Sequence, residues 1–181
     1  MKLPSPQFVG YFPKRTLPKP DWLNVEVVAE IGSVSNCMSR GPEDWISAWK
    51  HNALGFFDDE PTALALAASE SGSFDFYAYE LYPLAALDNV VEPIKINVQP
   101  EWVAAGYKFL GFDIVTRSMG HFFECSPLSC NHAASHYVVN SYCLIDDEAQ
   151  AYQALLDMSD PGAGVEPGPC YLIKVYRKEL S

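Results

Sequence analysis

The sequence predicts an α+β domain: a mixed, mostly antiparallel sheet of about six to eight strands, with four or five short helices. Short runs rich in β-branched and aromatic residues recur along the chain, while the helical segments do not alternate regularly with them. The 181 residues are 49% hydrophobic and carry no repeat, which favours one domain over 1–181. Residues 1–20 form a basic strand and proline-rich turn, and residues 111–136 a loop segment rich in Cys and His.

The expected strands are runs in which apolar side chains alternate with smaller or polar ones. Pro13 is expected to end the first of them, and Pro93 interrupts the fourth. In chain order, we expect strands over 7–12, 25–34, 74–81, 90–98, 108–116, 122–125, 138–145 and 170–176.

The expected helices begin at acidic residues or prolines, which suit a helix N-terminus. Asp59 or Glu60 is expected to cap one helix, and Asp146 and Asp147 the most regular helix of the chain. Capping explains both acidic runs without catalysis. The expected helical segments are 42–51, 61–69, 100–106, 131–136 and 147–158.

The net charge of −11 is unevenly distributed along the chain. Residues 21–173 hold five basic and twenty-two acidic residues, whereas both ends are basic. An acidic body excludes broad binding to nucleic acid or to an anionic membrane. If the first and last strands were neighbours, the two ends would form one positive patch.

No export signal or membrane-spanning apolar run is recognised, which predicts a cytoplasmic protein with reduced thiols. The chain has five Cys. Cys37, Cys143 and Cys170 have apolar neighbours and are predicted to be small core residues.

Residues 111–136 contain two of the five Cys and three of the four His. Four residues separate Cys125 from Cys130 and three separate His132 from His136, spacings that zinc ligands use. Only Asn131 separates the two pairs, which leaves the chain little room to close a tetrahedral site. A zinc site on these four residues is therefore one alternative, against the default expectation of no cofactor.

A second alternative makes Cys130 a nucleophile with His121, or else His132, as its base. Asn140 or Asp113 would orient the base. Arg117, Arg40 and Asn131 are the candidate ligand-binding residues, because arginine grips carboxylate or phosphate groups. Arg117 equally suits an ion pair with Asp113 or Glu124. The third alternative is a packed surface loop with no chemistry.

The function predicted is a small acidic interaction protein that binds a basic protein partner, as inhibitors and immunity proteins do. The alternative is a metal- or thiol-dependent enzyme or binding site built on residues 117–136. The sequence leaves open whether the protein is an enzyme.

Overall fold

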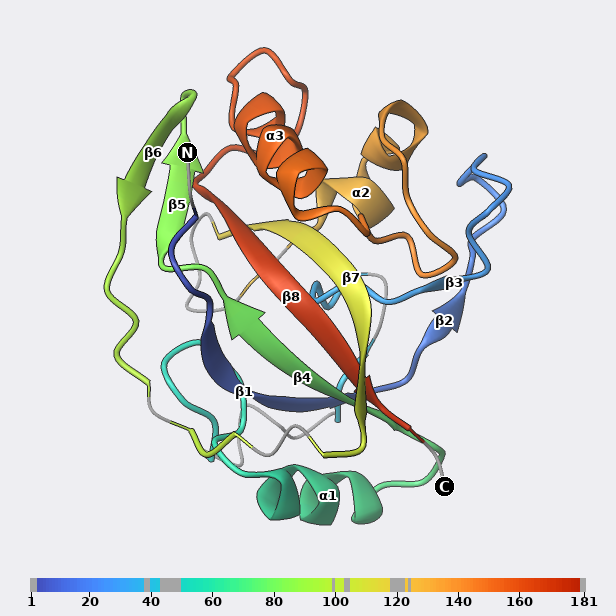
Figure 1. Ribbon diagram of the computed structural model, residues 1–181. Coiled ribbons are helices and arrows are strands. Elements are labelled where there is room, and N and C mark those ends of the chain that lie inside the picture. The colour runs from blue at the N-terminus through green and yellow to red at the C-terminus, as the bar shows by residue number, and fades with distance from the viewer. Residues whose placement is uncertain are drawn as a thin grey trace.

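A computed structural model describes residues 3–37, 40–42, 50–98, 100–102, 105–117, 123 and 125–179. These residues form an α+β fold around a six-stranded antiparallel sheet, which confirms the predicted class (Figure 1). The described part contains three α-helices, fewer than the four or five helices predicted, and one single-turn 3-10 helix. The helix expected over 42–51 falls mainly on residues outside the described ranges.

The main sheet is centred on its last strand in chain order, β8. Along one edge β8 pairs with β7; along the other it pairs with β4 and, beyond the end of β4, with β5. β1 pairs with β4, and β6 with β5. The strands are β1 (Gln7–Lys14), β4 (Asp75–Leu81), β5 (Leu84–Leu87), β6 (Val90–Pro93), β7 (Tyr107–Thr116) and β8 (Cys170–Lys178). A separate two-stranded sheet joins β2 (Leu17–Pro18) and β3 (Glu30–Ile31).

Capping residues define the two longer helices. The Asp59 side chain accepts a hydrogen bond from the Thr62 amide at the start of α1 (Glu60–Ala68), at 2.8 Å. Asp147 does the same for the Gln150 amide in α3 (Glu148–Met158), also at 2.8 Å. Both caps agree with the sequence prediction. Between them lie the short helix α2 (Pro127–Cys130) and the 3-10 helix η1 (Ala133–His136).

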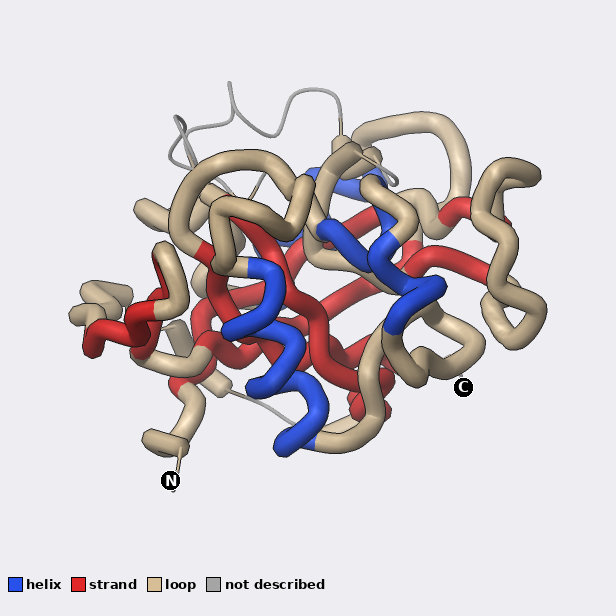
Figure 2. Tube along the Cα trace, turned by 90° about the horizontal axis from the view of Figure 1, so that it is seen from above, coloured by secondary structure: helices blue, strands red, loops and turns tan. Residues whose placement is uncertain are grey.

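The sheet is buried on both faces. Leu172 of β8 belongs to one apolar cluster, whereas its neighbours Ile173 and Val175 belong to another. Successive strand residues point to opposite faces, so β8 contributes to both clusters. α3 contacts β7 and β8 in the first cluster, and α1 contacts β1. Figure 1 places α2 and α3 at the top and α1 at the bottom, and Figure 2 views the molecule from the top side.

Two expected strands are wrong. Residues 138–145 form turns, and only Ile145 makes a β-bridge, to Phe112. The Asn140 side chain accepts the amides of Tyr142 and Leu144 and so replaces a strand partner with a local one. Of residues 25–34, only Glu30–Ile31 form a strand.

Two further strand boundaries differ from expectation. β1 continues through Pro13 because it lies at the end of the sheet order, where a missing amide donor is tolerated. The expected strand 90–98 ends at Pro93, and β5 before it was not anticipated. Asp88 and Asn89 connect β5 to β6 with φ of 51° and 62°, as in a two-residue hairpin turn.

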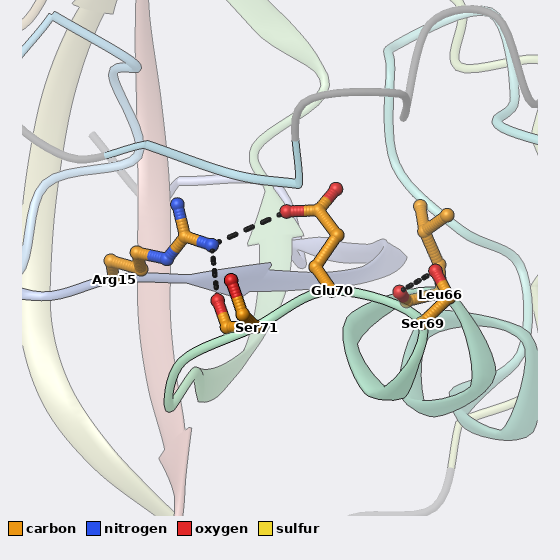
Figure 3. A network of polar contacts seen from close by, with 5 residues as sticks. All are labelled: Arg15, Leu66, Ser69, Glu70 and Ser71. Atoms are coloured by element: carbon orange, nitrogen blue, oxygen red, sulfur yellow. Dashed lines mark hydrogen bonds and ion pairs between the residues drawn. The ribbon is translucent and has the colours of Figure 1, made fainter.

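The terminal cations that the structure describes do not form the single positive patch considered from the sequence. β4 lies between β1 and β8, so the first and last strands are not neighbours. Arg15 contacts Glu70 at 3.3 Å and the Ser71 carbonyl at 2.9 Å, at the C-terminal end of α1 (Figure 3).

The cations of β8 are also paired with acids. Arg177 contacts Glu30 at 2.7 Å, Lys174 contacts Glu80 at 4.0 Å, and Lys178 contacts Glu60. Among the described residues, no helix is long and apolar enough to cross a membrane.

Candidate functional site

Lys14, the last residue of β1, is 1% exposed although it carries an ammonium group. Its Nζ donates hydrogen bonds to the carbonyls of Ser33 and Ser35, each at 2.9 Å, and to that of Val34. Three acceptors match the three protons of an ammonium. Burial lowers the Lys14 pKa to about 7, and the negative charges of Asp113, Cys37 and Cys130 oppose that shift.

Asp113 of β7 is fully buried on the other side of the same segment. One carboxylate oxygen accepts the Ser33 hydroxyl at 2.9 Å and the Val34 amide at 2.8 Å. The other accepts the Ser126 hydroxyl at 2.6 Å. Burial raises the Asp113 pKa, and these three hydrogen bonds oppose the rise. Asp113 therefore ties the 33–35 segment to the residue that precedes α2.

Both segments held by Asp113 lead to cysteines. Cys130 ends α2, and its amide donates to the Ser126 carbonyl at 2.8 Å. The hydroxyls of Ser129 and Ser35 each lie 3.9 Å from the Cys130 Sγ. Interaction with Cys130 contributes to raising the pKa values of the Cys125 and Cys37 thiols.

The groups around the Cys130 sulfur favour its thiolate form. The hydrogen bond from the Cys125 thiol is the main cause that lowers the Cys130 pKa, and the Ser126 backbone and the hydroxyls of Ser129 and Ser35 add to it. Burial opposes the shift. Interaction with Cys130, together with burial, raises the pKa of Cys125. Of the two thiols, Cys130 is therefore the one that favours the thiolate form.

The three thiols differ in access to solvent. Cys125 is buried, Cys130 is partly buried and Cys37 is exposed. The prediction that Cys37 is a core residue is therefore wrong, whereas Cys143 and Cys170 are buried as expected. The Cys37 backbone amide donates a hydrogen bond to the Ser35 hydroxyl at 3.1 Å, which holds Cys37 near Cys130.

The predicted zinc ligands divide into two groups in the structure. Cys125 and Cys130 are adjacent, but His132 and His136 are both exposed. The His132 ring packs edge-on against Trp22, with ring centres 4.6 Å apart. Within the described ranges, no group of three or more His, Cys, Asp and Glu is arranged to hold a metal ion.

Of the remaining predicted site residues, Arg117 is the one that lies at a cavity. Its guanidinium reaches the Ala53 carbonyl at 3.5 Å, and it lines a cavity of about 280 Å³ together with Lys95 and Tyr171. Asp113 is instead bonded to the 33–34 segment and Ser126.

The other candidates have structural contacts or cannot be placed. Arg40 is exposed, and its carbonyl accepts the Arg15 amide at 2.9 Å. The Asn131 amide donates to Pro127 at the end of α2. His121 and Glu124 lie outside the described residues.

Sequence reasoning missed Lys14, the two serines of 33–35 and the position of Cys37. Two signals were present in the sequence. A lysine closes the apolar run of the first strand, and Ser33 and Ser35 precede Cys37 at two-residue spacing. Asp113 was proposed as an orienting group, and it orients the two cysteine-bearing segments instead of a histidine.

Comparison of the chain with protein-family models, with curated proteins and with solved structures finds no match.

Proposed function

We propose that this protein is a thiol-dependent enzyme whose nucleophile is the thiolate of Cys130. The observation that carries the proposal is that the hydroxyls of Ser35 and Ser129 each lie 3.9 Å from the Cys130 sulfur, while the Ser126 carbonyl accepts the Cys130 amide at 2.8 Å. Interactions with Cys125, Ser126, Ser129 and Ser35 lower the Cys130 pKa. A thiolate is the nucleophilic form of cysteine, and hydrogen bonds to the charged form stabilise it.

The buried pair Lys14 and Asp113 supports the same proposal. Burying a lysine and an aspartate is costly, and a protein retains such groups most often where they position or polarise a functional group. Here the pair fixes the segment that carries Ser35 and Cys37, and Asp113 also holds Ser126. Lys14 further supplies a positive charge that interacts with Cys130.

Alkylation rates of the five cysteines test the proposal. The reduced protein is treated with iodoacetamide at pH values from 5.5 to 9, and each cysteine is quantified by peptide mass spectrometry. We expect Cys130 to react first at pH 6 to 7, ahead of the more exposed Cys37, whose pKa is raised mainly by partial burial. Faster labelling of Cys37, or five equally slow thiols, would refute the thiolate.

Two variants test whether Cys125 lowers the Cys130 pKa, or whether the Cys130 rate depends only on its exposure to solvent. Cys125→Ala removes the main donor to Cys130, and each unit by which the Cys130 pKa rises lowers its thiolate fraction at acidic pH by about tenfold. The matched control is Cys143→Ala, which removes another buried thiol, one that donates to the Leu128 carbonyl at 3.6 Å. We expect this control to leave the Cys130 rate unchanged.

A second candidate function is the acidic interaction protein, with a basic partner. A hollow of about 250 Å³ is lined by three acids, Asp146, Asp147 and Glu148, by the exposed ring of Phe109 and by one cation, Lys174, whose ammonium lies 5.9 Å from the centre of that ring. Acids around an aromatic ring suit a Lys or Arg side chain, through ion pairing and contact with the ring face. The three acids also have structural contacts, with Asn140, Gln150 and Tyr82, which is why this candidate is second.

Binding of an arginine-rich peptide tests the second candidate. We expect fluorescence anisotropy to show binding at low salt, weakening at high salt because exposed charges are screened. Phe109→Ala should weaken binding, whereas Leu87→Ala, another exposed apolar residue outside the hollow, should not. Equal binding by both variants would exclude this hollow as the site.

A further inference from the structure

We propose that Cys37 is the resolving thiol for Cys130, so that the two form a reversible disulfide when Cys130 reacts with a small disulfide compound. This inference rests on the proposed thiolate function of Cys130 and adds its partner and its class of substrate. It is carried by one hydroxyl, that of Ser35, which contacts both the Cys37 backbone amide and the Cys130 sulfur from distant parts of the sequence.

The Ser35 side chain brings the two thiols together. Its hydroxyl accepts the Cys37 amide at 3.1 Å and lies 3.9 Å from the Cys130 Sγ. The Ser35 hydroxyl is thus a shared neighbour of the Cys37 backbone and the Cys130 sulfur, and interaction with Cys130 contributes to raising the Cys37 pKa. The Ser35 amide in turn donates to the Ser33 hydroxyl at 3.0 Å, so the segment is anchored at Asp113.

Access and local structure favour Cys37 over Cys125 as the partner. A resolving thiol must lose its proton to solvent and then move toward the other sulfur. Cys37 is exposed, whereas Cys125 is 1% exposed and its backbone forms a β-bridge to Thr116, with the Thr116 amide donating at 2.8 Å. Cys125 is therefore suited to donate a hydrogen bond throughout the reaction.

The reaction balances with a disulfide as the oxidant. The Cys130 thiolate attacks one sulfur of the compound RSSR, the S–S bond breaks, and a thiolate RS⁻ leaves and takes a proton. Cys37 loses its proton, and its sulfur attacks the Cys130 sulfur of the mixed disulfide. The second RS⁻ then leaves and is protonated. Two protein thiols have been oxidised to one disulfide, and one RSSR has been reduced to two RSH.

Oxidised glutathione is a suitable probe. The reduced full-length chain is incubated with it near pH 7, quenched with acid, and analysed by intact mass and by mapping of disulfide-linked peptides. We expect the wild type to lose two hydrogens and to yield a peptide pair joined through Cys37 and Cys130. Cys37→Ser should stop at a glutathione adduct on Cys130. Cys125→Ser, the matched variant of the other neighbouring thiol, should still form the 37–130 disulfide.

The outcomes separate this inference from the proposed function. A stable glutathione adduct on wild-type Cys130, or a disulfide between Cys125 and Cys130, would overturn the role of Cys37 and leave the Cys130 nucleophile standing. A wild-type chain in which Cys130 does not react would overturn both. Cys130→Ser should abolish the 37–130 disulfide.

Discussion

The protein places its charges in two contrasting settings. Beneath the thiols, Lys14 and Asp113 are fully buried and are held by carbonyls, hydroxyls and an amide. Along β8, by contrast, Arg177 and Lys178 remain partly exposed and contact the carboxylates of Glu30 and Glu60. Buried charges depend on every partner, whereas water substitutes for a lost partner at the surface. The charged groups whose burial is most costly therefore hold the two segments that lead to Cys37 and Cys130.

The largest effect should follow from removing Asp113. Asp113→Ala leaves two hydroxyls and one amide without their acceptor, and we expect the free energy of unfolding to fall by about 3 to 5 kcal/mol. Urea unfolding measures the change. Asp113→Asn keeps an acceptor oxygen and should cost less. A loss comparable with that of the β8 pairs would remove the contrast between the two settings.

The Lys14→Met variant should reveal a pH dependence. The Lys14 pKa is about 7 in the folded chain and near 10.5 when unfolded, so between these values the unfolded state binds more protons. The free energy of unfolding of the wild type should therefore rise relative to Lys14→Met, by about 1 kcal/mol per pH unit from pH 7 to 10. This gain is lost as pH falls from 10 to 7, and below pH 7 the slope disappears because both states bind the proton. Parallel stability curves for the two proteins would contradict a buried, titrating Lys14.

A helix cap provides an intermediate effect at an exposed charge. Asp147→Ala removes the acceptor for the Gln150 amide and should lower the free energy of unfolding by about 1 kcal/mol. Thermal unfolding of this variant and of Asp147→Asn, which keeps an acceptor oxygen, measures the capping contribution. An Asn variant as unstable as the Ala variant would argue against capping.

The smallest effect is expected for Arg177→Gln. Arg177 is 23% exposed, and its pair with Glu30 should contribute about 0.5 kcal/mol or less. A double-mutant cycle with Glu30→Gln isolates the pair, and the coupling should shrink further in high salt. A coupling above about 2 kcal/mol would place the β8 pairs in the same class as the buried groups.

The sequence predicted those elements whose own residues determine them. α1 and α3 have acidic caps and β7 and β8 have long apolar patterns, and all four were found close to their expected bounds. The segment 138–145 has an equally good strand pattern. It fails as a strand because Asn140 bonds the amides of the residues that follow it.

The candidate site could be predicted only in part. Cys130 and Asp113 were identified from a local cluster, but some of their partners, Ser33 and Ser35, lie 80 and 95 positions away in the chain. Apolar periodicity reports which face of a strand is buried, and it does not report which polar group will be found there. The lysine that closes the first strand and the serines that precede Cys37 are therefore weak signals, because neither shows which groups will be their neighbours.

The central place of β8 has a consequence for synthesis on the ribosome. β4, β5 and β7 all pair with β8, which follows them in the chain. At about 5 to 20 residues per second, β8 is made about 5 to 20 s after β4. During this interval the earlier strands have unpaired edges, which are sites for wrong association. Nascent chains arrested before Cys170 should therefore be the species that most require a chaperone.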